Sequence, residues 1–282
     1  MGYDRIINNE ILREELLQMI KSGSVKIGNT EMYYAQFGSG ERVLIALPGL
    51  SDGLATVKGK ALVLMVSFKS FLKDFTVYMF SRKNSMPEGY TIEQMADDQV
   101  EAMRLLGINK ASILGVSQGG MISQYIAIKY PEMVDKLILA VTAPAINEVL
   151  KENVTGWIDM VGKDDHMSLM VDTAEKMYSE KYLSKNRKMF PIVAKFTKPK
   201  SYERFLRNAN AILAFDAGAR LSEIKSSTLI IAGDDDKTVG NEAAYELKSG
   251  IENSELFVYE GLGHGAFEEA KDFYDRVYKY II

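Results

Sequence analysis

Short, continuous runs of apolar residues alternate along most of the chain with longer segments in which apolar residues recur every three or four positions. Short runs are typical of strands buried on both faces of a parallel sheet, and the longer segments are typical of helices packed on those faces. Buried strands are predicted at residues 42–47, 76–80, 111–116, 136–141, 228–232 and 255–259. Helices are predicted between or after them, at residues 61–74, 92–106 and 267–280. The pattern therefore predicts an α/β fold with a parallel sheet and helices on both faces.

The first forty residues follow a different pattern. Apolar positions predict an amphipathic helix at residues 10–20, followed by a hairpin with strands at residues 24–27 and 31–37. Gly28 and Asn29 separate the two strands, and this pair suits a tight turn.

The alternation of strands and helices stops at about residue 145 and resumes after residue 223. The intervening segment has helical patterns rich in Met, Lys and Tyr, interrupted by Pro191 and Pro199, and contains no convincing buried strand. A helical insertion on the carboxyl-edge side of a parallel sheet covers the edge where such sheets bind ligands. We therefore expect a core domain of residues 1–144 and 224–282 and a helical cap of residues 145–223.

Composition narrows the classes of partner. The 282 residues include 47% hydrophobic and 26% charged residues, the balance of a globular protein, and the net charge is −4. This charge disfavours nucleic acid and anionic membrane surfaces, which both attract a clustered basic face. Because the chain has no cysteine, disulfides, thiolate metal sites and a cysteine nucleophile are excluded.

The sequence also predicts a soluble protein of the cytoplasm. The first residues lack the basic start and apolar core of a signal peptide. The longest apolar stretch, residues 61–68, is too short to span a bilayer. No membrane-spanning segment is expected.

The most informative motif is Gly115-Val-Ser-Gln-Gly119, which lies between the predicted strand 111–116 and a helical pattern at residues 121–130. A strand that turns sharply into a helix strains the residue at the turn, and the flanking glycines leave room for it. This is the setting of a G-x-S-x-G nucleophile elbow, with Ser117 as the nucleophile. A glycine-rich turn that only lets a helix pack on a sheet is the alternative, but it does not explain a hydroxyl at the apex.

A serine hydroxyl needs a neighbouring base, and the chain has only two histidines. His264 lies between glycines in a loop directly after the last predicted strand, so it can reach the sheet edge near Ser117. His166 lies in the helical insertion and is expected to be structural. His264 is therefore the predicted base.

The acid that orients this base is expected after the strand at residues 228–232. Asp234, Asp235 and Asp236 follow Gly233 there, and three adjacent carboxylates cannot all be buried. Asp236 is favoured because its position lets it fold back toward the sheet edge. The order Ser, Asp, His along the chain separates this arrangement from other triad lineages.

Acyl transfer also needs hydrogen-bond donors for the developing oxyanion, each worth about 3–4 kcal/mol. One predicted donor is the Gln118 amide, at the start of a helix whose dipole favours negative charge. The second is the Leu50 amide in the loop at residues 47–51, because Gly49 lets the preceding carbonyl turn away. An ordinary strand-ending turn is the alternative for this loop.

Together these residues resemble the α/β-hydrolase superfamily, in particular its compact members with a helical cap after the sixth strand. The resemblance covers nearly the whole chain and implies a mostly parallel eight-stranded sheet. It is specific for the fold and the triad but not for the substrate, because the family includes esterases, lipases, C–C bond hydrolases, thioesterases and lactonases. Serine at the elbow separates the chain from dehalogenases and epoxide hydrolases, which resemble this fold but use aspartate.

Two segments differ from the usual pattern of that family. Pro48-Gly49 replaces the usual His-Gly of the oxyanion loop. Phe80-Ser-Arg-Lys-Asn replaces the usual Asp-x-Arg-Gly, and Arg82 is expected to be structural.

The sequence thus predicts a serine hydrolase that cleaves a small or medium acyl ester, with no cofactor or metal and with a small-molecule substrate. Apolar side chains of the insertion are expected to line an adaptable pocket. These are Trp157, Met160, Met167, Met170, Phe190, Phe196 and Phe215. The alternatives are a ligand-sensing protein with slow hydrolysis, a thioesterase, and a C–C bond hydrolase. The last would need an arginine of the insertion, at position 187, 204, 207 or 220, to face Ser117.

Overall fold

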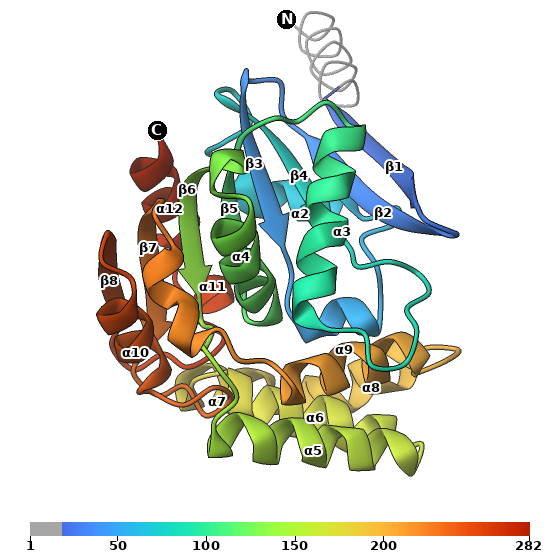
Figure 1. Ribbon diagram of the computed structural model, residues 1–282. Coiled ribbons are helices and arrows are strands. Elements are labelled where there is room, and N and C mark those ends of the chain that lie inside the picture. The colour runs from blue at the N-terminus through green and yellow to red at the C-terminus, as the bar shows by residue number, and fades with distance from the viewer. Residues whose placement is uncertain (1–18) are drawn as a thin grey trace, which may run out of the picture.

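The computed structural model of the chain describes residues 19–282 (Figure 1). Within these residues one eight-stranded sheet has the strand order β1-β2-β4-β3-β5-β6-β7-β8. The strands are β1 (Ile20–Ile27), β2 (Thr30–Phe37), β3 (Arg42–Leu47), β4 (Phe75–Phe80), β5 (Ala111–Val116), β6 (Val134–Ala140), β7 (Ser227–Gly233) and β8 (Ser254–Tyr259). Residues 10–18 of the predicted helix lie outside the described residues. The prediction is wrong for its last two residues, because Met19 is in a turn and Ile20 begins β1.

Most strands of the sheet run parallel. β2 is antiparallel to both of its neighbours, β1 and β4, and every pair from β4 to β8 is parallel. Gly28 has a φ of 60° in the turn between β1 and β2, which explains why glycine follows β1. The predicted hairpin and the mostly parallel α/β sheet are confirmed.

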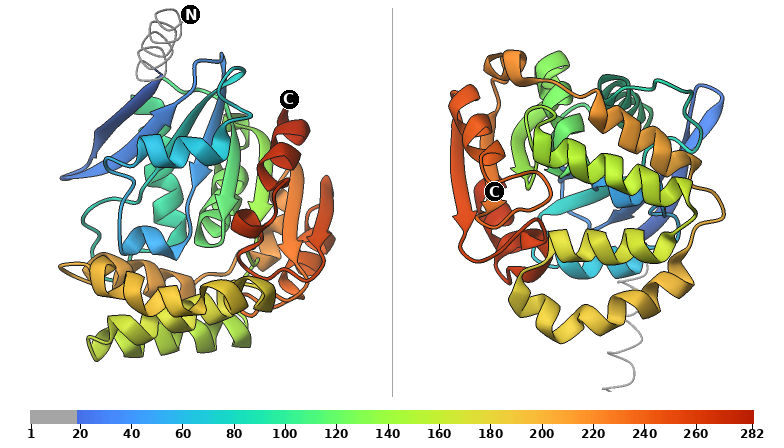
Figure 2. Two further views of the ribbon diagram at one scale, coloured as in Figure 1. Left: turned by 180° about the vertical axis from the view of Figure 1, so that it is seen from behind. Right: turned by 90° about the horizontal axis from the view of Figure 1, so that it is seen from below.

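Helices cover both faces of the sheet (Figures 1 and 2). Each face has its own apolar core. One core joins the sheet to α3 (Ile92–Leu105), α4 (Gln118–Lys129) and α10 (Ala243–Gly250). The other joins it to α2 (Ala61–Met65) and α12 (Phe273–Ile281). The remaining short elements of the core are η1 (Leu50–Gly53), η2 (Val66–Phe68), η3 (Pro131–Met133) and α11 (Ala266–Glu269). η5 (Gly218–Glu223) forms the end of the insertion before β7.

Two predicted helices are shorter than expected. The segment predicted as a helix at residues 61–74 is α-helical only to Met65 and continues as the 3-10 helix η2. Met65, Phe68 and Phe71 are all buried, and a spacing of three residues suits the period of a 3-10 helix. The segment predicted at residues 267–280 is divided into α11 and α12, because Ala270 between them is extended.

Five helices lie between β6 and β7, across the edge of the sheet at which the parallel strands end (Figure 1). For their position alone we call these five helices the cap helices: α5 (Glu148–Gly162), α6 (His166–Met177), α7 (Glu180–Asn186), α8 (Phe190–Thr197) and α9 (Glu203–Leu213), with η4 (Arg187–Met189) between α7 and α8. Figure 2 (right) shows them as one layer in which α8 is at the outer edge beside α6. A bridge between Ala145 and Asp216 joins the two ends of the insertion. No helix among residues 19–282 is both long and apolar enough to cross a bilayer.

The first turn of α4 packs very closely against two strand ends. A Cβ atom on Gly119 would lie 2.0 Å from the carbonyl oxygen of Leu47, at the end of β3. A Cβ atom on Gly120 would lie 2.6 Å from the Cγ2 atom of Thr142, just after β6. These glycines therefore set the distance between the start of α4 and the sheet.

We predict opposite effects for two Gly→Ala substitutions. Gly119→Ala should lower the free energy of unfolding by about 3 kcal/mol or more, because backbone cannot move away as a flexible side chain can. Gly156→Ala, within α5, should raise it by about 0.5–1 kcal/mol, because no atom lies within 4 Å and alanine favours a helix. Urea unfolding of both variants measures these changes, and wild-type stability of Gly119→Ala would contradict the close packing.

Candidate active site

Ser117 stands between β5 and α4 in a strained backbone conformation, with φ 54° and ψ −120°. A positive φ is uncommon for a residue other than glycine. Hydrogen bonds hold this conformation: Ser117 N–H donates to the carbonyl of Ala140 at 2.9 Å, and the Ser117 carbonyl accepts from Thr142 Oγ1 at 2.7 Å. The half-buried hydroxyl is thereby fixed at the carboxyl edge of the sheet.

The three residues that the sequence singled out as a triad lie in one hydrogen-bonded row. His264 Nε2 lies 2.9 Å from Ser117 Oγ, and His264 Nδ1 lies 2.9 Å from Asp236 Oδ2. His264 and Asp236 are both buried, although 28 residues separate them and 147 separate His264 from Ser117. The loops after β5, β7 and β8 thus bring a hydroxyl, an imidazole and a carboxylate together.

Asp236, rather than its two acidic neighbours, faces the imidazole. Its Oδ1 accepts hydrogen bonds from the backbone N–H groups of Thr238 and Val239, at 2.9 and 3.0 Å. Asp234 instead accepts from the Gly261 N–H, and Asp235 forms an exposed ion pair with Lys237. The carboxylate of Asp236 is therefore fixed by main-chain donors and aimed at His264.

The Leu50 and Gln118 amides are both at helix starts beside Ser117. A Cβ atom on Gly49 would lie 3.3 Å from Ser117 Cβ, so the loop after β3 touches the serine. The Gly49 carbonyl accepts from Asp52 N–H within η1, and the N–H of the same trans peptide, on Leu50, points the opposite way. Within the described part of the chain, neither the Leu50 nor the Gln118 amide donates a hydrogen bond to a protein acceptor. Both donors are therefore free for a ligand.

A buried polar network behind the elbow was not predicted from the sequence. The Gln118 side chain accepts from Arg82 Nη2 at 2.9 Å and donates to the carbonyl of Asn208, on α9, at 2.8 Å. Asp52 Oδ2 accepts from the Arg82 N–H at 2.9 Å and from Arg204 Nη2 at 2.8 Å. The network therefore joins η1, the end of β4 and the elbow to the cap helix α9.

Arg82 stays charged within this network. Burial lowers the pKa of Arg82 to about 10, against the opposing effect of Asp52, so the guanidinium is protonated at neutral pH. The expectation that Arg82 is structural agrees with its contacts, because its side chain is buried and bonded to Gln118.

Other cap residues hold the loops that carry Asp236 and His264. On α5, Asn153 Nδ2 donates to the carbonyls of Lys237 and Thr238, at 2.8 and 3.0 Å. The carbonyl of Met177, the last residue of α6, accepts from the N–H of Gly265 at 2.6 Å. The cap helices therefore contact every loop of the candidate site.

His166 and the four arginines considered in the sequence analysis make other contacts, and none of these contacts is with Ser117, Asp236 or His264. His166 begins α6, its Nε2 lies 3.2 Å from Thr197 Oγ1, and burial lowers its pKa. Each arginine considered for C–C bond cleavage pairs with a carboxylate: Arg187 with Glu175 and Glu180, Arg204 with Asp52, Arg207 with Glu88 and Glu203, and Arg220 with Glu223.

The expectation that Phe196 lines a pocket is wrong, because 84% of its surface is exposed. Trp157 is buried and donates to Asp172, and Phe215 is buried against the ring of Tyr125. Phe190 stacks on Tyr178. The three methionines at 160, 167 and 170 are half-buried.

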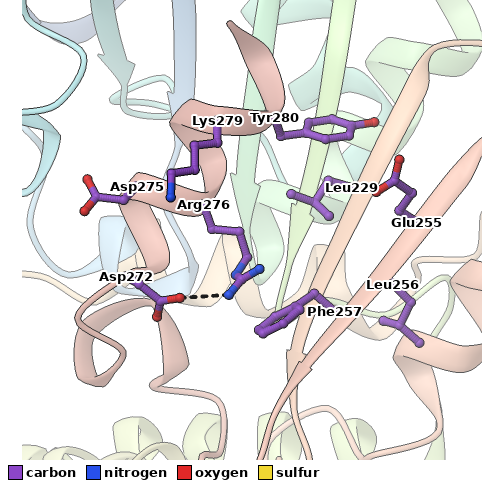
Figure 3. Close-up of a pocket in the computed structure, with 9 residues that line it drawn as sticks. All are labelled: Leu229, Glu255, Leu256, Phe257, Asp272, Asp275, Arg276, Lys279 and Tyr280. Atoms are coloured by element: carbon purple, nitrogen blue, oxygen red, sulfur yellow. Dashed lines mark hydrogen bonds and ion pairs between the residues drawn. The ribbon is translucent and has the colours of Figure 1, made fainter.

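A groove seen elsewhere on the sheet is separate from these residues (Figure 3). It lies between β8 and α12, where Arg276 is paired with Asp272 and stacked over the ring of Phe257. Of the described residues that line it, none belongs to the row of Ser117, Asp236 and His264. Within residues 19–282, no group of three or more histidines and carboxylates is arranged to hold a metal ion.

The family model for the alpha/beta hydrolase fold matches residues 68–271. The chain belongs to this family. It is 31% identical over 194 residues to the AB hydrolase superfamily protein YisY of Bacillus subtilis, a match that covers 66% of this chain and 71% of that protein. It is 29% identical over 199 residues to the putative carbamate hydrolase RutD of Caulobacter vibrioides, which covers 64% of this chain and 68% of that protein.

Among solved structures, the chain resembles the alpha/beta hydrolase MGS-M2 from a Medee basin deep-sea metagenome library, with a TM-score of 0.81. The sequences are 21% identical, and the match covers 92% of this chain and 96% of the other. At this identity the likeness shows the fold. Family membership and the names of the relatives together support a hydrolase enzyme.

We predict that Arg204 stabilises the contact between α9 and η1. Arg204→Met should lower the free energy of unfolding by about 2–4 kcal/mol, because it leaves the buried Asp52 carboxylate with one cation fewer. Arg207→Met, one turn along the same helix, removes only longer and exposed contacts and should cost less than about 1 kcal/mol. Urea unfolding of both variants measures these changes. An equal loss of stability in the two would contradict a stabilising role of the ion pair between Arg204 and Asp52.

Proposed function

We propose that the protein is a serine hydrolase that cleaves small or medium acyl esters through Ser117, His264 and Asp236. The observation that carries this proposal is the row of contacts from Ser117 Oγ to His264 Nε2 and from His264 Nδ1 to Asp236 Oδ2, each 2.9 Å long. A hydroxyl within hydrogen-bond reach of an imidazole, itself oriented by a buried carboxylate, is an activated nucleophile.

In the proposed reaction, Ser117 Oγ attacks the acyl carbonyl while His264 Nε2 takes its proton. The Leu50 and Gln118 amides donate to the oxyanion of the tetrahedral intermediate, where the start of α4 adds a favourable dipole. His264 then gives the proton to the departing alcohol, and an acyl-enzyme remains on Ser117. Water, deprotonated by His264, attacks this ester and releases the acid, and Ser117 recovers its proton.

Residues 145–223 act in this proposal as a cap over a core of residues 1–144 and 224–282. The contacts of Asn153, Met177 and Asn208 support this division, because they join α5, α6 and α9 to the loops that carry the proposed triad. The cap would restrict access to the serine and select the acyl group. We place the enzyme in the cytoplasm, where a chain without cysteine is stable to reduction.

A carbamate is the second candidate substrate, because a relative 29% identical to the chain is named a putative carbamate hydrolase. The same three residues could attack a carbamate carbonyl. C–C bond cleavage is less well supported, because the four arginines of the insertion pair with carboxylates. A thioesterase would use the same chemistry, so a panel of ester, thioester and carbamate substrates separates these activities.

We predict that Ser117→Ala lowers turnover of p-nitrophenyl acetate or butyrate by at least about 10⁴-fold, since it removes the nucleophile. The wild-type enzyme should be labelled by a fluorophosphonate at Ser117, and the variant should not. Undiminished turnover by the variant would defeat the proposal. Turnover below ~0.01 s⁻¹ on every ester, with tight stoichiometric binding of a ligand, would instead indicate a sensor.

We predict that two neighbouring carboxylates respond differently to amidation. Asp236→Asn should lower kcat by about 10³-fold or more, because the amide no longer holds the required His264 tautomer. Asp235→Asn should leave kcat within about twofold, since it removes only an exposed ion pair with Lys237. Steady-state kinetics measure both variants, and an equal loss in the two would remove Asp236 from its proposed role.

A further inference from the structure

The cap helix α8 turns its apolar side outward. Met189, which directly precedes α8, and Ile192, Val193 and Phe196 within it have exposed fractions of 56, 56, 37 and 84%. Their spacing of three and four residues places them on one side of the helix. The opposite side is packed, because Ala194 is buried and Phe190 stacks on Tyr178. We call the four outward residues the α8 apolar face.

The position of α8 in the fold leaves the α8 apolar face exposed to solvent. α8 is at the outer edge of the layer of cap helices and packs on α6 (Figure 2, right). A contiguous apolar surface on a protein is commonly a site of interaction.

Basic residues flank the α8 apolar face along the chain. Residues 180–200 contain six lysines and one arginine but only one glutamate, a net charge of +6 in a chain whose total is −4. Arg187 pairs with Glu175 and Glu180, and Lys198 pairs with Asp164. The other five lysines of this segment are exposed and form no ion pair with a residue of the described range 19–282: Lys181, Lys185, Lys188, Lys195 and Lys200.

We propose that the α8 apolar face and its lysines bind the surface of an anionic lipid bilayer. An apolar helix face flanked by lysines lies in the headgroup region, where the apolar side chains enter the acyl boundary and the lysines meet anionic headgroups. Protein interfaces, in contrast, are depleted of lysine and enriched in arginine and tyrosine. The charge around the face therefore favours a membrane surface as the occupant over another protein.

Binding through the α8 apolar face would also orient the protein on the bilayer. Since α8 belongs to the layer of cap helices, that layer would then face the lipid surface. The surface binding is independent of the ester cleavage proposed above, because it needs neither Ser117 nor a substrate.

Cosedimentation of the full chain with vesicles tests the proposal. Vesicles of phosphatidylcholine with about one third phosphatidylserine should bind the protein at least about tenfold more tightly than phosphatidylcholine alone. Binding should fall steeply in about 0.5 M salt, which screens the lysines. Phe196→Trp should give fluorescence that brominated lipids quench on binding, while the native Trp157 is buried in the cap.

Two sets of variants separate the contribution of the lysines to vesicle binding from that of the apolar side chains. Lys185→Glu/Lys188→Glu/Lys195→Glu should weaken binding by about 100-fold or more, at about fivefold for each lysine removed. Ile192→Ser/Phe196→Ser should weaken it at least about tenfold. The controls Lys21→Glu/Lys26→Glu on β1 and Leu105→Ser on α3 change exposed residues of other elements and should bind within twofold of wild type.

Far-ultraviolet circular dichroism and turnover of a water-soluble ester should be unchanged in every variant, which shows that each is folded. Failure of the wild type to bind anionic vesicles at low salt would overturn the proposal, as would equal weakening by the control variants. A concentration-dependent dimer that Ile192→Ser/Phe196→Ser abolishes would assign the face to a second copy of the chain instead.

Discussion

The close contact between the start of α4 and the ends of β3 and β6 is the constraint on which the candidate site depends. Gly119 and Gly120 permit this contact, and they leave Ser117 with a positive φ between strand and helix. The strain is offset by hydrogen bonds to Ala140 and from Thr142. Because these bonds come from β6 and the residues after it, the position of the hydroxyl is set by the sheet and not by a flexible loop.

The candidate row could be predicted because its residues are few and follow the strands. Two histidines and three adjacent aspartates left little choice, and buried parallel strands bring their carboxyl ends to one edge. Element boundaries were less predictable: Met65, Phe68 and Phe71 repeat at three residues, so the segment after Met65 is not an α-helix. Phe196 was expected to line a pocket with other apolar residues of the insertion, but its outward direction depends on which side of α8 packs on α6.

The network of Asp52, Arg82, Gln118 and Arg204 could not be predicted from sequence spacing. These residues come from four segments, and a polar residue near a strand end is more often exposed than paired. The net charge of −4 likewise does not show how charge is distributed, since residues 180–200 alone carry a net charge of +6. The network depends on which residues meet in space, and the basic segment depends on where the charges lie along the chain. Neither can be read from the total charge or from the composition.

The hydrogen bonds from Asn153 to the Lys237 and Thr238 carbonyls, and from Gly265 to Met177, have a consequence for how the molecule works. They attach α5 and α6 directly to the loops that carry Asp236 and His264. In the proposed reaction, a displacement of these helices large enough to break the bonds would also loosen the alignment of Asp236 with His264. Admission of a bulky substrate and proton transfer would then belong to different conformations of the protein.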